Sequence, residues 1–219
     1  GDMGGLLQGT DEPPAALLLG SYIVDGGGTI LFAPPGAGKS YTGLAMAVSL
    51  NHGRDCIWKL TDTRKVIFIN LERSRQSLAA RLGAVNRALG LPTETPLPFM
   101  NARGRSLADV YEATARTMAQ YGCDTPFLDS ISRTGVGDLN ANQVVNQIVD
   151  LLNRLGKTWV ALGHTSRQDA SHVFGGIHFD AGADILVRLT SQTAADGKST
   201  GVSLLVNKAN DTPTGASSV

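Results

Sequence analysis

The chain has 219 residues, of which 42% are hydrophobic, and this size suits one domain with a single core. Its 19 Lys and Arg side chains equal its 19 Asp and Glu side chains, which excludes a protein that binds nucleic acid through its overall charge. No apolar run approaches the ~20 residues needed to span a membrane, and the two distant cysteines, Cys56 and Cys123, indicate reduced thiols. We therefore expect a cytoplasmic protein without a membrane partner.

Short apolar runs alternate with segments of helical periodicity along the chain. Residues 1–20 are predicted to be an irregular lead-in, and residues 21–219 are predicted to form a single domain. Strands are predicted at residues 28–33, 65–70, 97–102, 125–130, 158–163, 183–189 and 201–208. Helices are predicted at residues 39–50, 75–89, 107–121 and 144–155.

The helix ends and the alternation of elements predict the fold class. Ser74 and Ser106 are predicted N-caps, Asp109 stands in capping-box order with Ser106, and Gly122 marks a helix end. Alternating strands and helices predict an α/β fold, with a mostly parallel central sheet flanked by helices. The last two strands are close in sequence, so they are predicted to form a C-terminal antiparallel hairpin.

The segment LFAPPGAGKSYTG, residues 31–43, lies between a predicted strand and a predicted helix. Gly36 and Gly38 allow the backbone to wrap around phosphate oxygens, and the helix N-terminus favours an anion. Lys39 is predicted to reach the β- and γ-phosphates of ATP, and the Ser40 hydroxyl to bind Mg²⁺. The usual first glycine of this pattern is Ala33 here. The predicted nucleotide-binding residues are Pro35, Gly36, Ala37, Gly38, Lys39, Ser40 and Tyr41.

Polar residues follow four of the later predicted strands. Glu72 stands in VIFINLERS, Asp129 in FLDS, His164 in VALGHTSR and Lys208 in NKANDTPTG. Taken in this order with the phosphate loop, these motifs resemble the RecA-like ATPase core. They are most similar to the phage and plasmid members of the DnaB- and RepA-like hexameric replicative helicases. The resemblance extends from about residue 20 to about residue 215.

The resemblance implies a role for each of these residues. Glu72 corresponds to the glutamate that polarises the attacking water, and Asp129 to the aspartate that holds the Mg²⁺ shell. His164 corresponds to the residue that reports the γ-phosphate to the DNA-binding loops. Lys208 corresponds to a basic residue inserted into a neighbouring subunit's ATP site, although Asn210 replaces the arginine that helicases carry two residues later. A homo-oligomer, as a hexameric ring or a filament, in a bacterial or phage-infected cell is therefore expected.

Two segments between these motifs correspond to the loops with which the family binds DNA. They are residues 131–142 and 165–180, and both are rich in glycine and polar residues. Arg133 and Arg167 are candidates for contacting the phosphates of single-stranded DNA, and His172 or Phe174 for stacking on a base. Ordinary surface loops have the same composition, so this interpretation stays open beside the DNA-binding one.

The leading hypothesis is an ATP-hydrolysing motor core that acts on single-stranded DNA in replication or recombination. One alternative is a recombinase or loader ATPase that forms filaments without unwinding DNA. Another is a DNA-binding, structure-specific nuclease whose RecA-like core is regulatory or vestigial. A small-molecule kinase is the least favoured class, because it needs neither Glu72 nor the C-terminal hairpin.

Overall fold

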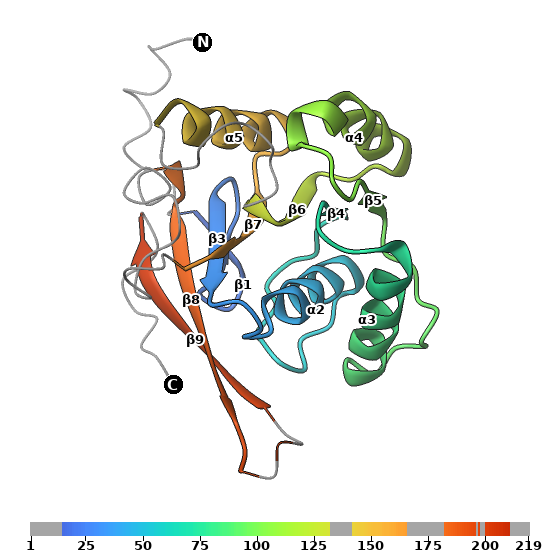
Figure 1. The fold of residues 1–219 in the computed structure, drawn as a ribbon, viewed down its shortest axis with the longest axis vertical. Helices are drawn as coiled ribbons and strands as arrows, with labels where there is room; N and C mark the ends of the chain where they lie inside the picture. Colours follow the sequence, from blue (N-terminus) through green and yellow to red (C-terminus); the bar gives the residue numbers. More distant parts are fainter. Residues whose placement is uncertain (1–14, 132–141, 166–181, 196, 198–199, 211–219) are drawn as a thin grey trace.

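A mostly parallel sheet forms the centre of the computed structural model, which describes residues 15–131, 142–165, 182–195, 197 and 200–210. Within these residues the sheet has seven strands, in the order β5-β4-β6-β7-β3-β8-β9. The strands are β3 (Gly28–Ala33), β4 (Val66–Asn70), β5 (Phe99–Asn101), β6 (Thr125–Asp129), β7 (Trp159–His164), β8 (Ile185–Thr193) and β9 (Thr200–Ala209). Only β8 and β9 pair antiparallel among the described strands of this sheet. The predicted fold class is confirmed (Figure 1).

Helices cover both faces of the sheet. The described helices are α2 (Lys39–His52), α3 (Arg75–Ala88), α4 (Leu107–Tyr121) and α5 (Asn142–Leu155). Residues alternate between the two faces along each strand, so neighbouring side chains enter different clusters. Leu31 of β3 belongs to the cluster packed against α2 and α3, whereas Ile30 and Phe32 belong to the cluster packed against α4 and α5.

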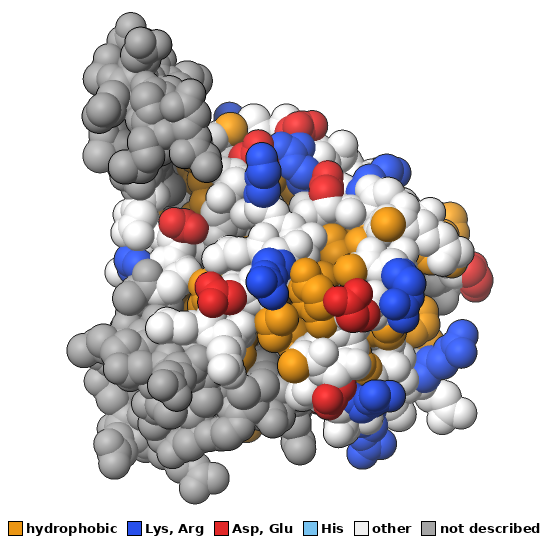
Figure 2. Space-filling model, turned by 90° about the horizontal axis from the view of Figure 1, so that it is seen from above, with side chains coloured by type: hydrophobic (Ala, Val, Ile, Leu, Met, Phe, Trp, Pro, Cys, Tyr) orange, Lys and Arg blue, Asp and Glu red, His pale blue; other side chains and the backbone are white. Residues whose placement is uncertain are grey.

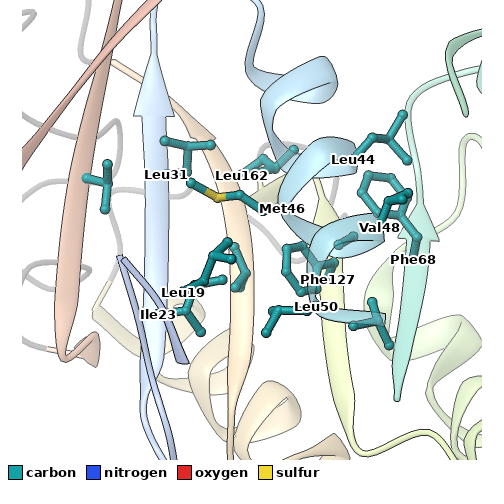
Figure 3. Packing of buried hydrophobic residues seen from close by; sticks show 14 of the residues in the cluster. Leu19, Ile23, Leu31, Leu44, Met46, Val48, Leu50, Phe68, Phe127 and Leu162 are labelled. Carbon is teal, nitrogen blue, oxygen red and sulfur yellow. The ribbon is translucent and has the colours of Figure 1, made fainter. Parts of the chain in front are cut away.

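The larger hydrophobic cluster fixes α2, the helix that follows the phosphate loop. Figure 3 shows Met46 of α2 lying against Leu31 and Leu162, and other α2 side chains near Phe68 and Phe127. The rings of Phe68 and Phe127 stack with their centroids 6.5 Å apart. Burial of each such side chain contributes about 1.5–3 kcal/mol, so this packing holds the start of α2 beside the end of β3.

Local signals in the sequence set the helix boundaries. Ser74 accepts a hydrogen bond from the backbone N–H of Ser77, and Ser106 and Asp109 form a reciprocal capping box. Gly122 follows α4 with a φ of 66°, a left-handed conformation that glycine adopts without steric cost. These predicted caps are confirmed.

Residues 17–24 differ from the irregular lead-in expected up to residue 20. Leu17–Leu19 forms β1, which pairs antiparallel with β2 (Ile23–Val24). Leu18, Leu19 and Ile23 are buried in the cluster that contains α2. Strands of two or three residues carry too little periodicity to be distinguished from a loop, which explains the missed hairpin. The strand β6 begins at Thr125, as predicted, and its second residue, Pro126, lies opposite Ile67.

The C-terminal hairpin is longer than predicted. The strand β8 continues through the polar residues 190–193, beyond the predicted end at residue 189, and β9 extends the predicted strand 201–208 by one residue at each end. Their far ends project past the rest of the sheet (Figure 1). None of the described helices is long and apolar enough to cross a membrane.

Candidate nucleotide-binding and catalytic site

The phosphate loop connects the end of β3 to the start of α2. Gly36 and Gly38 have φ values of 81° and 99°, which are unfavourable for residues with a Cβ. A Cβ at Gly36 would meet no atom within 4 Å, so backbone conformation rather than space explains this glycine. The loop delivers the N-terminus of α2, with its unpaired N–H groups, to the carboxyl edge of the sheet, where an anion is stabilised.

A cavity of about 340 Å³ lies over this loop. The cavity lies at the ends of four parallel strands. The phosphate loop follows β3 and Glu72 follows β4, whereas Asp129 is the last residue of β6 and His164 the last residue of β7. Ala37, which the sequence also assigned to the nucleotide, is buried and is not among the described lining residues. The lining residues are Pro35, Gly36, Gly38, Lys39, Ser40, Tyr41, Glu72, Arg73, Arg81, Asp129 and His164.

The Lys39 ammonium lies inside this cavity and is buried. Its Nζ donates hydrogen bonds to the carbonyl oxygens of Ala33, at 2.9 Å, and Pro34, at 3.2 Å. It also lies 3.1 Å from His164 Nδ1. Burial lowers the pKa of Lys39 below its usual value, and the carboxylates of Glu72 and Asp129 oppose this shift. Lys39 is therefore placed where little water screens the interaction of its ammonium group with an anion.

Ser40 and Asp129 supply side-chain oxygen atoms to the cavity. Both residues line the cavity and both are buried, with Asp129 only 2% exposed. Burial raises the pKa of Asp129 above its usual value, and the nearby Ser40 side chain opposes this shift. A hydroxyl and a carboxylate fit Mg²⁺, which prefers oxygen ligands and binds through one or two carboxylates together with substrate phosphates.

Glu72 lies on a bend directly after β4. The backbone N–H of Leu71 donates to the Asp129 carbonyl, which joins this bend to the end of β6. The Glu72 carboxylate accepts a short hydrogen bond from the Ser130 hydroxyl and lies 3.6 Å from His164 Nε2. The structure thus gathers a carboxylate, an imidazole and an ammonium within one cavity.

A comparison with known families identifies the family of the chain. A family model described as an AAA domain matches residues 2–170, which is well over half of the chain. The chain belongs to this AAA domain family. It is therefore a P-loop ATPase. No curated protein matches the sequence.

Asn70 positions the glutamate of this AAA domain, and sequence reasoning missed it. Its buried side chain accepts from the backbone N–H of Arg73 at 2.9 Å and donates to the Arg73 carbonyl at 2.7 Å. It also donates to the Asn101 side chain, at 2.6 Å, on the neighbouring strand β5. Both backbone groups of Arg73 are thereby fixed, so the bend that carries Glu72 is held on either side.

Two arginines of the AAA domain, Arg73 and Arg81, line the cavity, although the sequence alone did not assign them to the nucleotide site. The Nε atom of Arg73 is buried without a hydrogen-bond partner among the described residues. The Arg81 guanidinium lies 4.5 Å from the centroid of the Tyr41 ring, a cation–π contact between α3 and α2. Nothing in the spacing of the sequence distinguishes these arginines from exposed ones, because their position depends on how α3 packs on α2.

Lys208 lies away from its own phosphate cavity. It stands opposite Leu186, which pairs with Ile30 of β3, whereas the phosphate loop begins after Ala33. This register separates Lys208 from Ala33 by about 10 Å along the strands and about 10 Å across them. Its Nζ donates to the Ala183 carbonyl at 2.8 Å, and Lys208 is not among the described residues that line the cavity.

The predicted DNA contacts Arg133, Arg167, His172 and Phe174 lie outside the described residues. The face of the AAA domain above α4 and α5 carries Lys and Arg side chains interspersed with Asp and Glu around an apolar strip (Figure 2). Its described part therefore presents no continuous basic surface, in line with the equal numbers of basic and acidic residues in the chain.

Proposed function

We propose that this AAA domain is an ATP-hydrolysing motor core that acts on single-stranded DNA in the manner of the DnaB- and RepA-like hexameric helicases. The observation that carries the proposal is the convergence of Lys39, Glu72, Asp129 and His164 in one cavity at the carboxyl edge of the sheet. Membership of a P-loop ATPase family supports ATP as the nucleotide. The helicase role and the DNA substrate rest on the order of motifs along the sequence.

The residues of the cavity divide the chemistry of hydrolysis among them. Lys39 neutralises charge that develops on the phosphates, at a site where positioning and electrostatics supply most of the catalysis. Ser40 and Asp129 would hold Mg²⁺, which would supply electrophilic stabilisation of the phosphate oxygens. Glu72 orients and polarises the attacking water. His164 is hydrogen-bonded to Lys39 and close to Glu72, so it is placed to respond to the γ-phosphate.

The proposed active form is a homo-oligomer, a hexameric ring or a filament, in which Lys208 acts on the ATP of a neighbouring subunit. Its distance from its own cavity supports a role in trans, and the β9 strand that carries it is an edge of the sheet among the described strands. Residues 21–219 would act as one motor domain in the cytoplasm of a bacterial or phage-infected cell. Arg133, Arg167, His172 and Phe174 are the proposed contacts to single-stranded DNA.

One experiment tests this function. ATP hydrolysis is measured with and without single-stranded DNA, and the oligomer mass is recorded in the same samples. Stimulation by DNA in a ring-sized oligomer is expected. Filaments without unwinding would favour the recombinase or loader alternative, and DNA cleavage with Mg²⁺ but without nucleotide would favour the nuclease. ATP hydrolysis that is independent of DNA at every oligomeric state would contradict a DNA motor.

A further inference from the structure

Arg73 brings a further positive charge to the phosphate cavity, beside those of Lys39 and Arg81. It directly follows Glu72, the residue proposed to orient the attacking water, on the bend after β4. The described lining of the cavity thus carries three Lys and Arg side chains, against the two carboxylates of Glu72 and Asp129. An excess of positive charge in a cavity favours a polyanion, such as the phosphates of a nucleotide.

The charge of Arg73 acts on the groups that face the phosphates and Mg²⁺ in the proposed site. Burial lowers the pKa of Lys39, and the charge of Arg73 adds to this shift, whereas the carboxylates of Glu72 and Asp129 oppose it. Burial raises the pKa of Asp129, and the charge of Arg73 is among the influences that oppose this shift. The Arg73 guanidinium is therefore close enough to act on both the phosphate-loop lysine and the buried aspartate.

The Arg73 side chain holds a hydrogen-bond donor without an acceptor. Its Nε is buried and has no hydrogen-bond partner among the described residues. The neighbouring carboxylate, Glu72, instead accepts from the Ser130 hydroxyl and lies 3.6 Å from His164 Nε2. A buried N–H without an acceptor is unfavourable, and folded proteins rarely keep one without a functional reason. A phosphate oxygen in the cavity would supply the acceptor, since the guanidinium fork matches phosphate geometry.

The surroundings of Arg73 differ from those of Arg81. The Arg81 guanidinium lies 4.5 Å from the centroid of the Tyr41 ring, which holds it beside the start of α2. The backbone of Arg73 is fixed on both sides by Asn70, through hydrogen bonds of 2.9 Å to its N–H and 2.7 Å to its carbonyl. Only the side-chain torsions of Arg73 are left to be ordered when it meets a phosphate, so the contact is largely preorganised.

We propose that Arg73 is a catalytic residue, whose guanidinium contacts the γ-phosphate of ATP in its own subunit and stabilises the charge that develops there during hydrolysis. This inference rests on the proposed ATPase site. The γ-phosphate must lie beside Glu72, which orients the water that attacks it, and Arg73 is the next residue along the chain. Lys208, by contrast, is proposed to act on the ATP of a neighbouring subunit. An arginine on the γ-phosphate acts mainly in the transition state, so its loss affects hydrolysis more than nucleotide binding.

The test compares ADP alone with ADP plus aluminium fluoride, which occupies the place of the transferred phosphoryl group. Calorimetric titrations with Mg²⁺ are run at protein concentrations that favour the monomer. Arg73→Ala should bind ADP within about twofold of the unsubstituted protein, whereas its affinity for ADP with aluminium fluoride should fall by about 10²-fold or more. Arg75→Ala, which removes an exposed arginine that is not among the described lining residues, should match the unsubstituted protein for both.

A second variant separates the role of Arg73 in catalysis from a role in the fold. Arg73→Lys keeps the charge and the aliphatic stem but loses the guanidinium fork, so its loss of affinity for ADP with aluminium fluoride should lie between zero and that of Arg73→Ala. Single-turnover hydrolysis should follow the same order, in samples that thermal unfolding shows to be folded. Equal weakening of both ligands in these variants, or weakening of neither, would overturn the proposal. Failure of the unsubstituted protein to bind ADP at all would instead overturn the proposed ATPase site.

Discussion

Lys39 Nζ and His164 Nδ1 are 3.1 Å apart, so the phosphate-loop lysine is hydrogen-bonded to the residue that ends β7. An ammonium group only donates, so Nδ1 accepts this bond, and the ring proton lies on Nε2, 3.6 Å from the Glu72 carboxylate. Lys39, His164 and Glu72 thus form a chain across the cavity. A bound phosphate that attracts the Lys39 ammonium would break the contact between Lys39 and His164. Because His164 also lies beside Glu72, nucleotide binding would then change the surroundings of the Glu72 carboxylate.

Lys39→Ala should abolish hydrolysis and leave the fold intact. The substitution removes a buried cation from the phosphate site, and loss of one such stabilising group lowers turnover by about 10²-fold or more. Phosphate release and circular dichroism are the measurements. Lys157→Ala, which removes an exposed lysine after α5, is the matched control. Turnover of Lys39→Ala equal to that of this control would remove Lys39 from the mechanism.

Glu72→Gln should trap bound ATP. The amide keeps the shape of the carboxylate but cannot polarise water, so turnover should fall by about 10²–10⁴-fold while ATP still binds. Nucleotide affinity and single-turnover hydrolysis are measured together. The control is Glu112→Gln at an exposed position of α4, which should hydrolyse ATP normally. If Glu72→Gln also hydrolyses normally, another group activates the water.

Asn70→Ala should lower turnover more than ATP affinity. The change removes the hydrogen bonds that hold the Arg73 backbone and leaves buried polar groups unpaired, at a cost of about 1–3 kcal/mol in the free energy of unfolding. The bend that carries Glu72 is then no longer fixed, whereas Lys39 and Ser40 are unaffected. Turnover and ATP affinity are compared after thermal unfolding confirms a folded sample. Unchanged turnover would show that Asn70 only stabilises the fold.

Asp129→Asn should stabilise the nucleotide-free protein while impairing Mg²⁺-dependent hydrolysis. Burial raises the pKa of Asp129 in the folded state, so this group stabilises the fold when protonated and loses that contribution as the pH rises through its folded-state pKa. Asn stays neutral, so the gain in melting temperature should be larger near pH 7 than at a pH of about 4. Melting curves at both pH values check this. If Asp129→Asn melts at a lower temperature than the unsubstituted protein at pH 7, neighbouring groups stabilise the Asp129 carboxylate by more than its burial costs.

The sequence predicts much of the fold, because each central strand is a short apolar run with a turn or a helix start behind it. The same reasoning locates Glu72, Asp129 and His164, since the carboxyl ends of parallel strands meet at one edge of a sheet. Arg81 and Asn70 escaped prediction for a different reason. Arg81 contacts Tyr41 on another helix, and Asn70 donates a hydrogen bond to Asn101 on another strand. The periodicity of a single segment carries no information on such contacts between elements.

Lys208→Ala should lower turnover in the assembly while leaving ATP affinity of the isolated subunit unchanged. This prediction follows from the register of β9, which holds Lys208 away from its own cavity, and from the proposal that it acts in trans. A cation supplied by a neighbour acts mainly when charge develops on the γ-phosphate. ATP affinity at concentrations that favour the monomer and turnover at concentrations that favour the oligomer are the two measurements.

Mixing two variants tests the trans role directly. In a mixed oligomer, Lys208 of a Glu72→Gln subunit can reach the intact ATP site of a Lys208→Ala subunit, and one complete site is restored. Partial recovery of hydrolysis is therefore expected. The control mixes Lys39→Ala with Glu72→Gln, whose defects both lie in the subunit's own cavity, so no interface becomes complete. Equal activity of the two mixtures, in samples shown by mass to contain mixed oligomers, would mean that Lys208 acts within its own subunit or only holds the Ala183 carbonyl.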